Sequence, residues 1–474
     1  MTTALVWFQN DLRLHDNEAL HRAASCHELI PVYIIDPHWF GETSFGFHKT
    51  GPHRARFLLE SIRQLRENLK SLGSDLVIRR GGTAEVLKEM VVRYRVDTVF
   101  AHGEVAPEEA AIERQVEQAL PVKVSFTRDN SLYHPEDIPF ETGGIPMVFT
   151  DFRKKLEAAS TIRPCHPTPE KLPGHGVKDT GSIPDPGELV EAPANRDRRA
   201  VLQFRGGEEA ALERLREYIW ERDRLKSYKW TRNGLLGADY SSKFSPWLAN
   251  GCLSARRIYR EVKQYEEERK RNVSTYWMIF ELIWRDFFRF SARKWGSDYF
   301  RPGGIQHRRR SWRRDQIYFT RWAEGTTGIP FIDANMRELN ATGYMSNRGR
   351  QNVASFLSQN LNIDWRMGAE FFESVLIDYD VYSNYGNWMY NAAVGHDPRN
   401  RYFNILNQAR KYDKNGEYVR QWLPELKQVP PEYVHEPHRM SPDQQQLAGV
   451  TVGEDYPRPM IDLEKSYRDI RNRD

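Results

Sequence analysis

The residues with the most chemical content lie between Asp378 and Trp388. This stretch of eleven residues holds two carboxylates, Asp378 and Asp380, the amide of Asn384 and an indole. Carboxylates accept hydrogen bonds from ring N–H groups, an amide can face a ring nitrogen in either protonation state, and an adjacent indole can supply an electron. Arg350, on a neighbouring predicted helix, could pair with either carboxylate. The segment indicates a buried redox heterocycle rather than a hydrolytic site.

A second polar group precedes a predicted helix that begins near Pro246. Ser241, Ser242 and Ser245 supply three hydroxyl groups, and Lys243 supplies an ammonium. Such donors at a helix start can bind a pyrophosphate. The alternative is an ordinary helix N-cap with an unused lysine.

A third group places a carboxyl and an aromatic ring on one helical face. Glu281, Trp284 and Arg285 are spaced i, i+3 and i+4, so their side chains are neighbours on a helix. A carboxyl and an indole in one pocket can hold a nucleic-acid base by proton donation and stacking. The alternative is a Glu281–Arg285 ion pair beside core aromatics.

The distribution of aromatic and basic residues leaves two further alternatives open. Of the 13 tryptophans, only Trp7 and Trp39 precede residue 200. Trp312, Trp365 and Trp388 lie on separate elements of the second half, where indoles are usually core residues unless something orders them as an electron path. Residues 308–314 include five arginines, which is typical either of phosphate binding or of a solvated loop.

Bulk properties exclude several classes of protein. A chain of 474 residues can form two or three domains, and its net charge of +4 does not by itself indicate a nucleic-acid partner. The three cysteines are far apart and form no C-x-x-C motif, so we expect no metal site and a reducing compartment. The start of the chain is no signal peptide, and no apolar run reaches the ~18 residues that span a bilayer. We expect a cytoplasmic protein without a membrane partner.

Residues 1–150 show the pattern of an α/β domain. Short apolar runs at 4–8, 29–35, 76–78, 98–101 and 122–126 alternate with helix-period segments at 51–72, 83–94 and 107–120. This alternation predicts a Rossmann-like parallel sheet with helices on both faces. No G-x-G-x-x-G and no Walker A sequence follows the first strand. Residues 10–16 occupy that position instead.

The rest of the chain divides into three segments. Residues 151–204 form a predicted interdomain linker, with seven prolines after residue 160. Residues 205–430 have helical periodicity, at 208–220, 255–268, 275–293, 330–339, 347–361 and 365–377. Residues 431–474 mix proline with charge, so we expect an irregular C-terminal segment.

Taken together, these motifs resemble the photolyase/cryptochrome family. Residues 6–17, VWFQNDLRLHDN, are similar to the opening of that family, with Gln9 where the family usually has arginine. The groups at 49–58, 241–246, 281–285, 347–350 and 378–388 follow in the family's order, and the resemblance covers about residues 1–430. Segments 50–52, 237–245 and 345–352 most resemble the cryptochrome-DASH branch.

The resemblance implies an α/β domain that binds an antenna pigment, a proline-rich linker and a helical domain that binds FAD. It implies a role in FAD binding for two groups of side chains and one further residue. They are Tyr228, Arg232, Ser241, Ser242 and Ser245 at the ribityl and phosphate region, Trp284, Asn347, Arg350, Asp378 and Asp380 around the ring system, and Asn384 facing flavin N5.

The resemblance also implies blue-light-dependent repair of cyclobutane pyrimidine dimers, a carbon-carbon lyase reaction driven by electron transfer from excited reduced FAD. Glu281 would bond to or protonate a carbonyl of the dimer, and Trp284 would stack on it. Trp388, Trp365 and Trp312 fall at the positions of the family's proximal, middle and distal electron-transfer indoles.

Three departures predict the kind of DNA that is repaired. Family members that act on duplexes usually have tryptophan at the position of Tyr390, methionine at Gln351 and histidine at Ser346. A smaller, more polar wall stabilises a flipped dimer less, and extrusion from a duplex costs a few kcal/mol. We therefore expect a monomer that acts on dimers in single-stranded DNA, with duplex DNA and RNA as weaker partners.

The resemblance implies 5,10-methenyltetrahydrofolate as the antenna, and Glu104, after the predicted strand 98–101, is its candidate contact. The alternative reading of Glu104 is a solvated acid at a strand end. The alternative function is a blue-light signalling photoreceptor with little or no repair activity. Signalling cryptochromes carry a long variable tail, and little of this sequence follows residue ~430.

Overall fold

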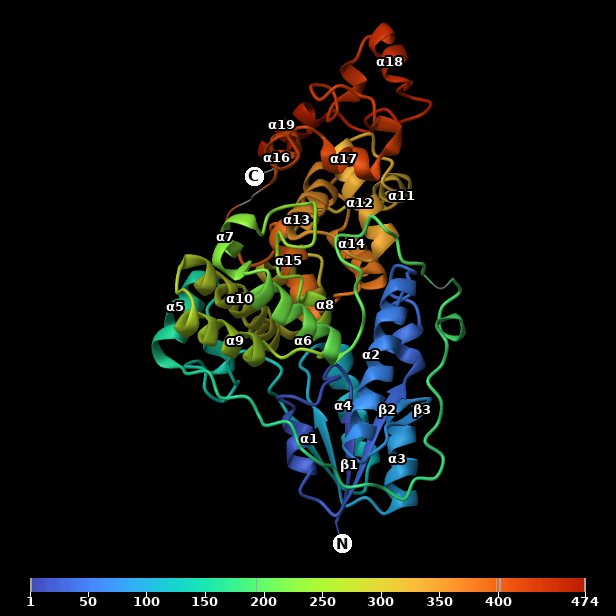
Figure 1. The fold of residues 1–474 in the computed structure, drawn as a ribbon. Helices are drawn as coiled ribbons and strands as arrows, with labels where there is room; N and C mark the ends of the chain where they lie inside the picture. The colour runs from blue at the N-terminus through green and yellow to red at the C-terminus, as the bar shows by residue number, and fades with distance from the viewer. Residues whose placement is uncertain (1, 193, 398, 400–401, 473–474) are drawn as a thin grey trace.

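The computed structural model describes residues 2–192, 194–397, 399 and 402–472. An N-terminal layer built on a parallel sheet lies beside a larger helical body (Figure 1). The five strands have the order β3-β2-β1-β4-β5, and all neighbouring strands are parallel. Their bounds are β1 Thr3–Phe8, β2 Glu28–Ile35, β3 Val77–Arg80, β4 Thr98–His102 and β5 Lys123–Thr127. The predicted Rossmann-like sheet is confirmed.

Both faces of the sheet are covered, as the continuous apolar strands predict. Along β1, Val6 and Phe8 pack into one hydrophobic core, whereas Leu5 and Trp7 pack into another on the opposite face. Side chains of a strand alternate between faces, so one strand supplies both cores. The helices of this domain are α1 Glu18–Ala23, α2 Pro52–Ser71, α3 Thr83–Tyr94 and α4 Pro107–Ala119.

The second half of the chain forms the helical body that holds the candidate site. Its longest helix begins after Asn272, whose side chain accepts hydrogen bonds from the backbone N–H groups of Ser274 and Thr275. The helices are α6 Glu208–Arg216, α7 Tyr228–Thr231, α8 Ser245–Ala249, α9 Ala255–Glu268, α10 Val273–Trp295, α11 Gln316–Glu324, α12 Pro330–Thr342, α13 Asn347–Ser355, α14 Trp365–Val375, α15 Val381–Asn391, α16 Ile405–Tyr412 and α17 Glu417–Trp422.

The structure differs from the sequence prediction at the two segments expected to be irregular. The first part of the predicted linker is helix α5, Phe149–Ala159, whose buried Phe152 packs on α10. The described residues between 160 and 207 then contain no α-helix and no strand. The C-terminal segment contains α18 Pro442–Ala448 and α19 Leu463–Arg471. Leu463, Tyr467 and Ile470 are buried on one face of α19. Their helical spacing could have predicted this helix, but the prolines of the segment led us to expect irregular structure.

The loop after β1 joins the two domains. Arg13 donates to the carbonyl oxygen of Gly251 at 2.9 Å, and Asp16 accepts from Arg256 of α9 at 2.6 Å. The Asp16–Arg256 pair is almost fully buried, with side-chain exposures of 0% and 2%. The loop after β1, the position of the phosphate loop in many nucleotide-binding proteins, therefore binds the helical body. Among the described residues, no helix is both long and apolar enough to cross a membrane.

Substitution of Gly251 tests this junction. Its φ is +69°, and an added Cβ would lie 1.9 Å from the carbonyl oxygen of Asn10, a backbone atom that cannot rotate away. We expect Gly251→Ala to lower the free energy of unfolding by about 3 kcal/mol or more, measured by urea denaturation. The matched control is Gly449→Ala, where φ is +62° and nothing lies within 4 Å. Equal losses in the two variants would contradict a special role for the junction.

Candidate functional site

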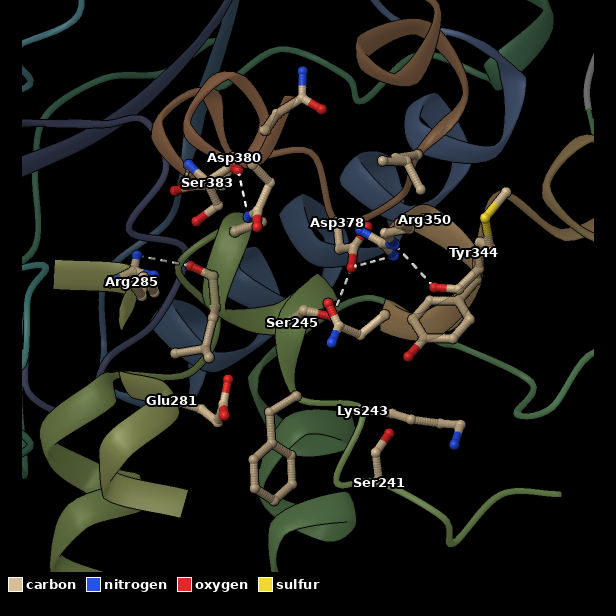
Figure 2. A pocket seen from close by; sticks show the side chains of 18 of the residues that line it. Ser241, Lys243, Ser245, Glu281, Arg285, Tyr344, Arg350, Asp378, Asp380 and Ser383 are labelled. Carbon is tan, nitrogen blue, oxygen red and sulfur yellow. Dashed lines mark hydrogen bonds and ion pairs between the residues drawn. The ribbon is translucent and has the colours of Figure 1, made fainter. Parts of the chain in front are cut away.

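A cavity of about 300 Å³ lies among helices α8, α10, α13 and α15 of the helical body (Figure 2). Its volume is in the range of small-molecule sites. The cavity brings together most of the residues predicted from the sequence. Those that line it are Tyr228, Arg232, Ser241, Ser242, Ser245, Glu281, Asn347, Arg350, Gln351, Asp378, Asp380, Asn384 and Trp388.

Asp378 lies in the cavity wall as a buried, half-satisfied carboxylate. Its Oδ2 accepts from the Ser245 hydroxyl at 2.6 Å and from the Arg350 guanidinium at 2.8 Å (Figure 2). Of the two carboxylates open to Arg350 from the sequence, Asp378 is the one it pairs with. Among the described residues, Asp378 Oδ1 has no hydrogen-bond partner. An acceptor of this kind suits a ligand N–H group in the cavity.

The next two polar residues are oriented by the start of α15. Asp380 is the N-cap of this helix and accepts from the backbone N–H of Ser383 at 2.8 Å. The Asn384 side chain donates to the carbonyl oxygen of Ala369 at 2.9 Å. That bond occupies one amide N–H, and the second N–H and the carbonyl oxygen of Asn384, which lines the cavity, remain for a ligand.

The serine-rich turn before α8 holds a buried lysine. Lys243 adopts φ of +59°, and only 2% of the residue is exposed. Its ammonium has no hydrogen-bond partner among the described residues, and it lies 3.2 Å from the centre of the Tyr240 ring. Burial lowers the pKa of Lys243 to about 6. An anion in the cavity would compensate the charged form, so Lys243 and the nearby Ser241 and Ser242 suit a phosphate group.

Glu281 forms an ion pair across the cavity rather than along its own helix. Its Oε1 lies 2.7 Å from Arg232 Nη1, while Arg285, one turn further on, donates to the carbonyl oxygen of Asn130 at 2.6 Å. The predicted alternative of a Glu281–Arg285 pair is therefore wrong. Burial raises the pKa of the Glu281 carboxyl, and the Arg232 charge lowers it only in part. The pKa of Glu281 thus lies above its ordinary value although Arg232 is its ion-pair partner.

Trp284 does not line this cavity. One face of its indole lies on the ring of Phe149, with centroids 3.7 Å apart and planes 9° from parallel. Its edge faces Tyr390 at 6.5 Å, and the Tyr390 hydroxyl donates to Asp397 at 3.0 Å. Trp284 and Tyr390 are thus brought together beside the cavity, and Phe149 from α5 is an aromatic partner that the sequence analysis missed.

The three predicted electron-transfer tryptophans form an ordered series. Trp388 lies in the cavity wall, and a Cβ at Gly368 of α14 would lie 2.2 Å from its ring. Trp365, one turn before Gly368, donates its indole N–H to the carbonyl oxygen of Pro302 at 3.1 Å. Trp312 donates to the same oxygen at 3.0 Å. The series passes from the cavity through the buried Trp365 to the half-buried Trp312.

Comparison with known proteins agrees with this arrangement. Residues 4–173 match the DNA photolyase family model, and residues 277–473 match the FAD binding domain of DNA photolyase. The chain is 54% identical over 473 residues to a cryptochrome DASH from Gloeobacter violaceus, covering 98% of this chain and 94% of the relative. This chain belongs to the photolyase/cryptochrome family, in its cryptochrome-DASH branch. The family resemblance of the sequence is confirmed.

Solved structures of this family superimpose over the whole chain. A cryptochrome from Synechocystis is 49% identical, with a TM-score of 0.97 and coverage of 100% of this chain and 99% of that one. A class III photolyase from Agrobacterium tumefaciens is 29% identical, with a TM-score of 0.85 and coverage of 100% and 98%. The cavity residues fit FAD, the cofactor of the matched domain. Asp378 Oδ1 offers an unused acceptor, and Lys243 offers an unused donor.

The family's FAD cavity includes residues that the sequence analysis did not assign. Asn387 and Asn391 line it together with Asn384 and Trp388. These four residues are spaced i, i+3, i+4 and i+7 along α15, so they share one helical face. That spacing is the signal that could have identified Asn387 and Asn391.

A second cavity lies where the photolyase α/β domain meets α10 and α15. Glu104 lines it, but its carboxylate already accepts from Arg289 at 2.8 Å and Tyr382 at 2.6 Å. Burial alone would raise the pKa of Glu104, yet Arg289 and His102 outweigh it and hold that pKa well below its usual range. Glu104 is thus buried in an interdomain network and is not a solvated acid. Glu109 lines the same cavity, and burial raises its pKa to about 8.

Proposed function

We propose that this chain is a blue-light-dependent flavoprotein that repairs cyclobutane pyrimidine dimers, mainly in single-stranded DNA, as a deoxyribodipyrimidine photo-lyase. The observation that carries this proposal is one cavity wall that holds Trp388, the unpaired oxygen of Asp378 and the half-buried carboxyl of Glu281. Bound FAD supplies the absorption of blue light and the transfer of one electron to the dimer and back.

The polar residues of the cavity hold and orient the cofactor. Asp378 Oδ1 would accept from a ring N–H group of the flavin, and the amide of Asn384 would face flavin N5. Two sets of residues complete the site, with Asn347, Arg350 and Asp380 around the ring and Tyr228, Arg232, Ser241, Ser242 and Ser245 at the ribityl and phosphate groups. An amide at N5 is a poor proton source, so Asn384 positions the ring without protonating it.

Glu281, Trp284, Gln351 and Tyr390 act on the substrate. The pKa of Glu281 is raised by burial, which favours a carboxyl that donates a hydrogen bond to a carbonyl oxygen of the dimer. Trp284 supplies an aromatic surface, although Phe149 covers one of its faces. Gln351 in the cavity wall and the Tyr390 hydroxyl beside it are polar, so they would stabilise an extruded dimer less than apolar groups would. Ser346 does not contribute to that wall, because it is buried as the N-cap of α13.

The second cavity is the proposed antenna site for 5,10-methenyltetrahydrofolate. Its position between the sheet and helices α10 and α15 would put a bound pigment next to the helices that line the FAD cavity. Glu104 is the candidate that the sequence offers for the pigment contact. Its carboxylate is already bonded to Arg289 and Tyr382, so Glu109 is the better placed acid to accept from a pterin N–H group.

The preference for single strands is tested with one dimer-containing oligothymidine, free or annealed to its complement. We expect the repair rate under blue light to be about 10- to 100-fold higher for the free strand, because extrusion from a duplex costs a few kcal/mol. A duplex with an unpaired bubble at the dimer serves as the control and should behave as the free strand. Equal repair of strand and duplex would refute the preference. An absence of repair in all three would favour the signalling alternative.

The tryptophan series is tested by Trp388→Phe in the flavin-loaded protein. We expect photoreduction of bound flavin to slow at least tenfold while the flavin stays bound, because a phenyl ring is far harder to oxidise than an indole. Trp322→Phe is the matched control, since Trp322 is buried and lies 6.1 Å from Trp388 but outside the series. Flavin absorbance under blue light with an external reductant gives both rates. An undiminished rate in Trp388→Phe would reject the path.

The antenna site is tested by comparing Glu109→Gln with Glu104→Gln. Loss of folate absorbance from Glu109→Gln alone, with flavin content unchanged, would assign the contact to Glu109. We expect Glu104→Gln to lower thermal stability, because it removes the charge that compensates the buried Arg289. Retention of folate by both variants would mean that neither acid is the pigment contact.

A further inference from the structure

The most exposed tryptophan of the described chain lies in sequence between Tyr228 and Arg232, two residues that line the FAD cavity. Trp230, in α7, is 71% exposed, which is unusual for a residue of this size. The ammonium of Lys229 lies 4.9 Å from the centre of the Trp230 ring and 4.4 Å from that of Trp277 in α10. A cation therefore lies between two indoles, one on each helix. Figure 1 shows α7 at the surface, next to α10.

The two tryptophans begin a row of aromatic rings along α10. The ring of Trp277 is stacked on that of Phe280 at 4.6 Å. Phe280 meets Phe149 edge-on at 5.1 Å, and Phe149 lies flat on Trp284. The row thus runs from the exposed Trp230 to the residues beside the cavity. We call Trp230, Lys229, Trp277 and Phe280 the aromatic ridge.

The charges around the ridge are mainly positive. Lys270 and Arg271 are exposed in the turn before α10. That turn lies against α7 and the residues before it, because Asn272 donates to the carbonyl oxygen of Lys226 at 3.0 Å and the Lys229 N–H donates to the Ser274 hydroxyl at 3.2 Å. Of the nearby acids, Asp223 pairs with Lys226 at 2.5 Å and Glu281 with Arg232 at 2.7 Å, whereas Glu267 and Glu268 are exposed just before the turn. A polyanion would meet unpaired cations here.

We propose that the aromatic ridge binds the unpaired nucleotides that flank the lesion in single-stranded DNA. The exposed Trp230 ring, with Lys229 against it and the cations before α10 nearby, suits a strand whose bases stack while its phosphates are neutralised. An apolar protein partner would instead fit a continuous apolar patch without interleaved lysines. The ridge is continuous with the cavity, since Arg232 lies 5.8 Å from the Trp277 ring centre and also lines the cavity wall. The inference rests on the proposed function, because it assigns the strand that carries the dimer.

The first experiment measures binding of a labelled, undamaged oligothymidine of about 12 nucleotides to the flavin-loaded protein in the dark. Trp230→Ala should raise the Kd between about 5-fold and about 150-fold, the equivalent of about 1–3 kcal/mol for one stacked base. Trp230→Phe should restore most of the affinity. The matched control is Ile317→Ala on α11, which is 75% exposed and far from the ridge in sequence. An unchanged Kd in Trp230→Ala would overturn the proposal.

A second pair of measurements separates stacking from charge. Against an abasic strand of the same length, Trp230→Ala should bind as the wild type does, because no base is left to stack. An equal loss for both strands would show that Trp230 does not act by stacking and would refute the proposal. Lys229→Gln should reduce the slope of log Kd against log salt by about 0.7. The exposed Lys88 of α3 provides the control, Lys88→Gln, whose slope should not change.

Repair kinetics distinguish failure of this inference from failure of the proposed function. Trp230→Ala should raise KM for a dimer in a long strand and leave kcat unchanged, because the ridge lies outside the reacting site. A fall in kcat at saturating substrate would place Trp230 in the site and overturn the inference. If the wild type repairs dimers and Trp230→Ala has an unchanged KM, only the ridge is refuted. If the wild type binds no strand at all, both proposals fail.

Discussion

The buried carboxylate of Asp378, which has hydrogen-bond partners at only one of its two oxygens among the described residues, holds together the helices around the cavity. Asp378 precedes α15, Ser245 begins α8 and Arg350 lies in α13, and all three meet at a single oxygen atom. A buried charge is costly unless it is paired and hydrogen-bonded, so these segments are stable together and not singly. The second oxygen is left to the cavity. A ligand that donates to it binds only the folded state and therefore stabilises the fold by mass action.

The α/β domain holds two of these helices from the other side. Glu104, at the end of β4, accepts from Arg289 of α10 and from Tyr382 of α15. The same two helices carry Glu281 and Asn384 into the FAD cavity. The positions of Glu281 and Asn384 thus depend on contact between the two domains. The buried Glu104–Arg289 ion pair fixes the geometry of that contact more strictly than apolar packing alone would. A pigment beside Glu104 would have a fixed orientation relative to the FAD cavity for the same reason.

Local sequence patterns predicted most of the helices and strands. Contacts between distant residues determine several side-chain positions and pairings that the sequence could not predict. The strands follow from apolar runs, and the cavity serines and carboxylates follow from motifs that lie within a few residues. The position of Trp284 depends on Phe149, which is 135 residues earlier. Phe149 begins helix α5, which directly precedes the proline-rich segment and was predicted as part of the linker. Glu281 pairs with Arg232 because α7 packs on α10, not because of spacing along one helix. The burial of Lys243 could not be predicted from the neighbouring residues, because a serine-rich turn with one lysine has the same sequence whether it is buried or exposed.

The polar cavity wall and the aromatic ridge favour the same substrate for independent reasons. Under the proposed function, Gln351 in the wall and the Tyr390 hydroxyl beside it would do little to offset the cost of extruding a dimer from a duplex. The ridge offers stacking to neighbouring bases, but bases inside a duplex are already stacked and gain nothing from Trp230. Only an unpaired strand avoids the first cost and gains the second contact. A surface selected for duplexes would need charge without exposed rings, whereas here the Lys229 ammonium contacts two indoles, one of them exposed.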